Sequence, residues 1–169
     1  MAILMKKIVA LLLMSLLLVG CTKDEPSAGG KKSAGGADGY EVAINGTTIT
    51  MHKEAADIIS ALGQTKDYYE AASCAFDGLD KQYFYEGYQV ETYPTDDKDF
   101  ISLVYIEKEG IPTKEGVQVG DSAEKVKEVY GTDYKDDFGT MIYSSGKTEL
   151  KFYFTGDKVS EIEYAAIIK

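Results

Sequence analysis

The sequence predicts an α+β fold of two tandem repeats, each with a helix, or a helical pair, packed on an antiparallel sheet of about three to four strands. Two segments carry apolar residues at helical spacing and end at a glycine, and several others alternate apolar and polar residues between turn residues. The same order of helix, glycine and strands occurs twice after residue 39. A helix with one apolar face has to bury that face, and a sheet in the same unit offers the partner surface.

The first repeat opens with a predicted hairpin and a predicted helix. Asn45-Gly46 divides the alternating segment 40–51, and Asn-Gly is the strongest short signal for a two-residue hairpin turn. A helix is expected over 53–62 because its apolar residues fall on one face. Gly63 follows at the position where a left-handed residue ends a helix.

The second repeat shows the same pattern 68 residues later (117 against 49). After the expected strand 116–120, Asp121 is the predicted N-cap of a helix, and Glu124 completes a capping box. The positions that correspond at this offset are Ile49 and Val117, Met51 and Val119, Ala55 and Ala123, Ile58 and Val126, and Gly63 and Gly131.

Strands are expected after each helix, which places the repeats at 40–109 and 116–169. Turn residues separate the alternating segments, as at Glu86-Gly87 and Gly156-Asp157. The expected strands are 74–76, 82–86, 88–93 and 100–106 in the first repeat, and 140–144, 148–155 and 158–165 in the second.

Residues 1–20 have the pattern of a signal peptide. Two lysines precede an apolar segment of about a dozen residues, which fits the apolar region of a signal peptide and is short for a membrane span. The segment ends in Leu-Val-Gly-Cys at Cys21, which resembles the lipobox of bacterial lipoproteins. The resemblance implies cleavage between Gly20 and Cys21 and attachment of a diacylglyceryl group to the Cys21 thiol, with acyl chains such as palmitate as the anchor. An ordinary signal peptide or a single membrane anchor is the alternative.

Residues 21–39 are predicted to be the lipidated cysteine and a flexible tether. The segment is rich in Gly, Ser, Ala and Lys and has no apolar periodicity. A flexible segment of this length has a root-mean-square reach of roughly 25 Å. We therefore expect the protein at the cell membrane, lipid-anchored on the extracytoplasmic face.

The charge of the chain excludes one class of partner. The chain has 18 Lys, no Arg, 28 acidic residues and a net charge of −10, which becomes −12 when the two lysines of the signal peptide are removed. Phosphate contacts need clustered cations and bidentate base recognition favours Arg, so nucleic acid is not an expected partner. The expected partners are the membrane, through the lipid, and a protein or peptide.

The opening of the second helical segment resembles a known sequence pattern. The pattern begins with apolar-x-apolar-Gly-x-Ser/Thr, where x is any residue, and a Val and a Gly follow later. Residues 117–131 follow it. It is similar to the beta-lactamase-inhibitor-protein-like superfamily, which carries the unit twice, and to the small outer-membrane assembly lipoproteins (BamE, also called SmpA/OmlA), which carry it once. The chain also resembles cell-surface lipoproteins of Gram-positive bacteria. These resemblances imply the fold and a binding role in general. Since Cys21 is consumed by lipid, Cys74 cannot form the disulfides of the inhibitor proteins.

No set of catalytic residues is evident, and we predict that the protein is not an enzyme and holds no cofactor or metal. His52 is the single His, and no Ser motif accompanies it. One His and one remaining Cys do not make a zinc site. The acidic clusters 96–99 and 133–137 lack the order of a calcium loop, and solvated turn charges explain them.

Aromatic residues on one sheet face suggest a binding surface. Alternation assigns a set of apolar residues to the face covered by the helices: Phe84, Val90, Val104, Ile106, Leu150, Phe152, Phe154 and Ile162. The opposite face would then carry five tyrosines among charged residues: Tyr85, Tyr93, Tyr105, Tyr143 and Tyr153. Tyrosine is enriched at protein interfaces, but it also simply suits strands. A register error of one residue would exchange the two sets.

The sequence therefore predicts a lipid-anchored, extracytoplasmic protein-binding module that is not an enzyme. The first alternative is a structural or assembly accessory lipoprotein of the envelope. The second is a wall-active hydrolase.

Overall fold

The computed structural model describes residues 39–168. The predicted signal peptide, the Gly20–Cys21 cleavage site, the lipidated Cys21 and the tether up to residue 38 lie outside the described residues. Among the described residues, no helix is long and apolar enough to cross a membrane.

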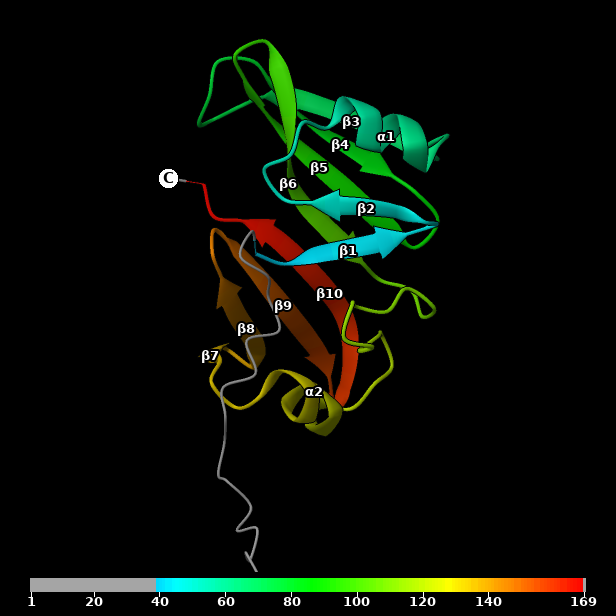
Figure 1. The fold of residues 1–169 in the computed structure, drawn as a ribbon, viewed down its shortest axis with the longest axis vertical. Helices are drawn as coiled ribbons and strands as arrows, with labels where there is room; N and C mark the ends of the chain where they lie inside the picture. Colours follow the sequence, from blue (N-terminus) through cyan, green and yellow to red (C-terminus); the bar gives the residue numbers. More distant parts are fainter. Residues whose placement is uncertain (1–38, 169) are drawn as a thin grey trace, which may run out of the picture. The chain divides into compact units, whose positions relative to one another are not determined.

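The main element is one eight-stranded antiparallel sheet (Figure 1). Its strands occur in the spatial order β3-β4-β5-β6-β10-β9-β8-β7, so that each half is a four-stranded meander and the last strands of the two meanders, β6 and β10, pair at the centre. The strands are β3 (Asp67–Ala72), β4 (Leu79–Phe84), β5 (Tyr88–Thr95), β6 (Lys98–Ile106), β7 (Lys135–Asp137), β8 (Thr140–Ser145), β9 (Thr148–Thr155) and β10 (Lys158–Ala166).

The predicted fold class is wrong. The described residues are mostly β, with a single large sheet and a separate two-stranded sheet, β1 (Glu41–Ile44) and β2 (Thr47–Thr50), instead of two helix-on-sheet repeats. Residues 39–168 contain two short helices, α1 (Ala56–Leu62) and α2 (Ala123–Tyr130). The physical reason is the pairing of β6 with β10, which merges the strands into one surface and removes two exposed edges. The predicted limit between the repeats, 109–116, falls in the connection from β6 to α2.

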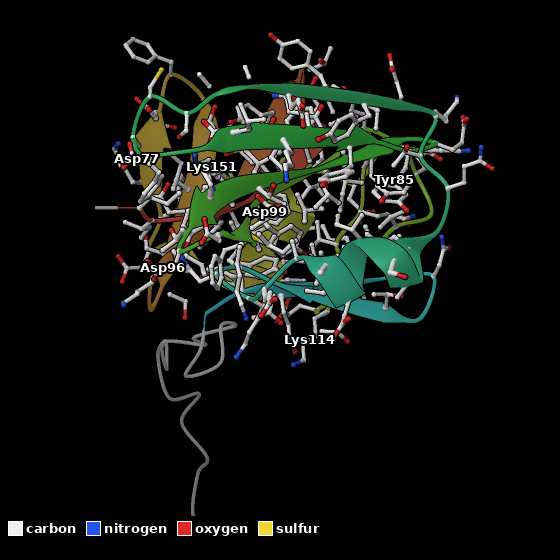
Figure 2. The ribbon with its side chains drawn as sticks, turned by 90° about the horizontal axis from the view of Figure 1, so that it is seen from above. Asp77, Tyr85, Asp96, Asp99, Lys114 and Lys151 are labelled. Atoms are coloured by element: carbon white, nitrogen blue, oxygen red, sulfur yellow. The ribbon has the colours of Figure 1, made fainter. Side chains whose placement is uncertain are left out.

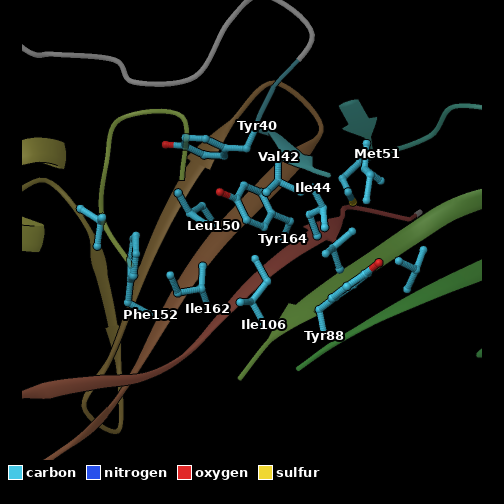
Figure 3. Close-up of a cluster of buried hydrophobic side chains, with 14 of the residues drawn as sticks. Tyr40, Val42, Ile44, Met51, Tyr88, Ile106, Leu150, Phe152, Ile162 and Tyr164 are labelled. Carbon is cyan, nitrogen blue, oxygen red and sulfur yellow. The ribbon is translucent and has the colours of Figure 1, made fainter. Parts of the chain in front are cut away.

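The hairpin β1–β2 and both helices lie on the same side of the large sheet (Figure 1). Val42, Ile44 and Met51 bring apolar side chains over the central strands, where they meet Ile106 and Tyr164 (Figure 3). Val126 and Tyr130 of α2 join the same buried cluster. The hairpin was correctly predicted, and Asn45 and Gly46 have the positive φ angles, 51° and 81°, of its turn.

Both helices begin later than predicted. Residues 52–55 pair with the start of β6, through hydrogen bonds from His52 N to Ile101 O (2.9 Å) and from Ala55 N to Asp99 O (2.8 Å). These backbone hydrogen bonds hold residues 52–55 against β6, so α1 begins at Ala56. The N-cap of α2 is Ser122, whose hydroxyl accepts from Lys125 N (3.2 Å). Asp121, the predicted N-cap, instead accepts from Gln118 N and from the Lys125 ammonium.

The predicted strand 74–76 lies in the loop between β3 and β4, and the two edge strands β3 and β7 were missed. Both edge strands carry charged or exposed residues in place of a clean alternation of apolar and polar residues. An edge strand needs a partner on one side only, so its sequence pattern is weak.

Candidate functional site

One face of the large sheet, the open face, points away from the buried cluster. In β6, Val104 and Ile106 belong to that cluster, so the alternating Leu103 and Tyr105 point to the other side. Across the sheet, Tyr105 lies opposite Glu163, and Tyr153 lies opposite Glu161. The open face consists of Glu91, Tyr93, Leu103, Tyr105, Lys151, Tyr153, Glu161 and Glu163.

Hydrogen bonds join the open face across its three central strands. Tyr153 Oη donates to Glu163 Oε2 (2.7 Å), and Lys151 Nζ donates to Glu163 Oε1 (2.9 Å). Tyr105 Oη donates to Glu161 Oε2, and its ring meets that of Tyr153 edge-on, with centroids 6.2 Å apart. The hydroxyls are therefore used within the chain. Ring surfaces and further carboxylate lone pairs remain to bind a partner.

Burial raises the pKa of both tyrosines on this network, and the adjacent glutamates raise it further. For Tyr105, desolvation is the largest cause of the raised pKa, and its hydrogen bond to Glu161 is the second. The same order holds for Tyr153 with Glu163. Both hydroxyls therefore stay protonated at neutral pH and act as donors to the carboxylates.

Glu91 extends the network toward β4. Its Oε1 accepts hydrogen bonds from the side-chain amides of Gln82 (2.9 Å) and Gln89. Burial raises the pKa of Glu91, the two amide donors oppose this rise, and the negative charges of Glu163 and Asp80 add to it. The centre of the open face is therefore a place where negative charge is already crowded and a cation would be favoured.

Two of the five predicted face residues lie on the other side of the sheet. Tyr85 is 8% exposed and Tyr143 is 4% exposed, and both belong to the buried cluster. Tyr85 stacks on Tyr88 with ring centroids 4.6 Å apart, and Tyr143 Oη donates to Gly131 O (2.8 Å) at the end of α2. The assignment of these two tyrosines to the open face is therefore wrong. Phe84, which alternates with Tyr85, takes the opposite side from the one predicted.

Tyr93 lies at one end of the open face beside His52. Glu91, Tyr93 and Thr95 alternate along β5, so they share this face. The His52 ring bridges two parts of the chain, with Nδ1 3.1 Å from Tyr93 Oη and Nε2 3.1 Å from Lys147 O. Since a carbonyl oxygen only accepts, the contact with Lys147 O assigns the donor role to Nε2, and in that tautomer Nδ1 accepts from the Tyr93 hydroxyl.

A cavity of about 400 Å³ opens beside this pair. Five segments form its walls: the turn before α1, the β3–β4 loop, the end of β5, the β8–β9 turn and the C-terminal residues. The lining residues are His52, Phe76, Tyr93, Thr95, Gly146, Lys147, Ile167 and Ile168.

Sequence reasoning missed most of this cavity. The sequence around His52 indicates neither a catalytic nor a zinc site, and Phe76 falls within the predicted strand 74–76. The positive φ of His52, 62°, is uncommon outside glycine and marks this residue, but it is seen only in the structure. Phe76, Tyr93 and Ile167 are far apart in the sequence, so their proximity in the fold could not be predicted from it.

The described residues offer no arrangement for a metal ion. In residues 39–168, no group of three or more His, Cys, Asp or Glu side chains could hold one. Cys74 is exposed and makes no disulfide there.

Comparisons with known proteins give a fold likeness only. No family model and no curated protein matches the chain. One solved structure, of an extracellular protein containing a SCP domain from Bacillus anthracis str. Ames, superposes with a TM-score of 0.52 at 9% sequence identity. The match covers 69% of this chain and 44% of that protein, so this chain spans less than half of its length.

Proposed function

We propose that this chain is a lipid-anchored, extracytoplasmic protein-binding module that is not an enzyme. Its partner contacts the open face of the large sheet. The anchor rests on the signal peptide and lipobox pattern that ends at Cys21. The binding role rests on the open face, which the described helices and the β1–β2 hairpin leave uncovered.

The single observation that carries the proposal is the Tyr–Glu network of this face. Rings of Tyr105 and Tyr153 are held in place by hydrogen bonds to Glu161 and Glu163. Rings that are fixed before binding lose little conformational entropy on binding, and tyrosine supplies large contact area. The crowded carboxylates favour a partner surface that carries Lys or Arg.

The tether would join the folded part at a defined place. Tyr40 N donates to the buried Thr148 Oγ1 (2.7 Å), directly beside the β8–β9 turn. A side chain at Gly39 would meet the same Thr148 hydroxyl at 2.4 Å, so glycine is required there. The folded part therefore begins beside the β8–β9 turn, whose Gly146 and Lys147 line the cavity.

The test is capture of a partner from solubilised membranes with the full-length protein. The double variant Tyr105→Ala, Tyr153→Ala removes both rings from the open face. Tyr68→Ala is the matched control, because Tyr68 is 44% exposed but lies opposite Tyr83, whose side chain points to the other side. We expect a stoichiometric partner that the control retains and the double variant loses. Equal capture by the wild type and a folded double variant would contradict the proposal.

Anchoring is tested separately. Cys21→Ala is expected to release the protein into the medium or leave an unprocessed precursor, because the thiol that would receive the lipid is gone. A variant that stays in the membrane fraction at the mature size would contradict lipidation at this residue.

A further inference from the structure

The cavity at the end of the open face has apolar walls that are open to solvent. Phe76 packs against Tyr93 with ring centroids 5.1 Å apart, and Tyr93 packs against Phe100 at 5.8 Å. Ile168 is 40% exposed beside them. An apolar cavity with a volume of about 400 Å³ is within the range of sites that bind small molecules or single large side chains.

Hydrogen bonds hold these walls in place. His52 connects Tyr93 to the Lys147 carbonyl, and the same carbonyl accepts from Ile167 N (2.8 Å). His52 adopts its positive φ of 62° in this arrangement. Such a conformation is unfavourable for a non-glycine residue and persists only where surrounding contacts impose it. The cavity is therefore preformed, which lowers the entropy lost on binding.

Charged residues follow three of the lining residues in the sequence. Asp77 follows Phe76 and Asp96 follows Thr95 (both are labelled in Figure 2), Asp97 comes next, and Lys53 follows His52. All four are exposed, so the acidic residues are in excess. Lys147 is the one lysine of the lining. The open face continues this negative charge through Glu91 and Glu163. An anionic ligand would be repelled at this end, whereas a cationic one would be attracted.

The chain's own tether does not suit the cavity. Residues 22–39 contain no Val, Ile, Leu, Met, Phe, Tyr or Trp, so they offer no large side chain to fill apolar walls. We infer that the cavity receives one large apolar side chain from a peptide segment of the protein partner, with lysines or arginines on both sides of it. This inference rests on the proposed function and adds the anchor residue and the charge of the partner segment.

The absence of Trp from the chain allows a direct test. The probe is the peptide acetyl-Lys-Gly-Trp-Gly-Lys-amide, titrated with full-length protein in detergent, with the same detergent alone as the blank. Trp emission then reports only the peptide. We expect a saturable blue shift, and acetyl-Glu-Gly-Trp-Gly-Glu-amide is expected to bind at least about tenfold more weakly at low salt.

Phe76→Ala removes one wall of the cavity, and Phe138→Ala is its matched control, because Phe138 is a fully exposed Phe in the β7–β8 turn. Phe76→Ala is expected to weaken binding about tenfold or more, and Phe138→Ala to leave it unchanged. Should Phe76→Ala fail to fold by circular dichroism, Ile168→Ala takes its place. A probe that shows no saturable shift, or that binds equally to the folded cavity variants, overturns the inference.

The two proposals fail in different ways. Loss of the captured membrane partner in Tyr105→Ala, Tyr153→Ala together with no peptide binding would reject the anchor cavity and keep the binding face. Peptide binding at the cavity together with capture that is indifferent to Tyr105 and Tyr153 would reject the face as the site of contact.

Discussion

The two faces of the large sheet both carry tyrosines, but the surroundings of their hydroxyls differ. On the covered face, Tyr85 and Tyr164 are buried and their hydroxyls have no hydrogen-bond partner among the described residues. On the open face, the hydroxyls of Tyr105 and Tyr153 donate to glutamates on the central strand. Tyrosine therefore serves packing on one side of the sheet and forms part of an ordered, acidic surface on the other.

The largest effect is expected in the covered face. Phe152 is fully buried and its ring contacts those of Tyr130 and Tyr143, with centroids 5.2 and 6.1 Å apart. Phe152→Ala is expected to lower the free energy of unfolding by about 3–5 kcal/mol, because it removes apolar contacts and leaves a cavity. Urea unfolding measures this, and a loss below about 1 kcal/mol would contradict the assignment of this face to the core.

A smaller effect is expected where the open face meets the cavity. His52→Ala removes the two hydrogen bonds of the ring, while the strain of a positive φ remains. The free energy of unfolding should fall by about 1–2 kcal/mol, measured by urea unfolding. His52→Asn is the control, because Asn adopts a positive φ more readily and should lose less. An unchanged stability of His52→Ala would mean that the ring does not hold the cavity walls.

Tyr164→Phe should change stability still less and in the other direction. Tyr164 is 1% exposed, and removing its unpartnered hydroxyl removes a polar group that burial has separated from water. We expect a gain of up to about 1 kcal/mol in the free energy of unfolding, read from thermal unfolding. A clear loss would show that the hydroxyl has a partner, such as a buried water.

The smallest effect concerns Glu91 and depends on pH. Burial raises the pKa of Glu91 in the folded state, so the folded chain binds its proton more tightly than the unfolded chain does. This carboxyl therefore favours folding at acidic pH and loses that contribution as pH rises from the unfolded pKa through the higher folded pKa. Glu91→Gln should thus be slightly more stable near pH 7, and its stability should depend less on pH. Thermal unfolding between pH 4 and 8 tests this, and the opposite sign would show that the amide donors outweigh the burial.

The core strands and the β1–β2 hairpin could be predicted because alternation and turn residues are local signals. The union of strands β3 to β10 into one sheet could not be predicted, since nothing in the sequence of β6 or β10 indicates that these two strands pair with each other. The edge strands were missed because their residues are not required to alternate.

The wrong assignment of Tyr85 and Tyr143 to the open face could have been corrected from the sequence. In a two-residue hairpin, residues directly opposite each other share a face, and Tyr85 N donates to Tyr88 O (2.9 Å) across such a turn. Tyr143 is likewise opposite Leu150, which alternation had placed in the core. Pairing each strand with its hairpin neighbour would have corrected both residues. Alternation considered one strand at a time could not have corrected either residue.

Photo-crosslinking in cells, with a benzophenone amino acid placed on either side of the sheet, tests directly whether a partner binds the open face. Leu103 lies in the centre of the open face, and Lys127 is exposed on α2 on the covered side. If a partner binds the open face, the protein labelled at position 103 will form one discrete crosslinked species and the protein labelled at position 127 will not. A discrete species from position 127 alone, or none from position 103, would contradict the account.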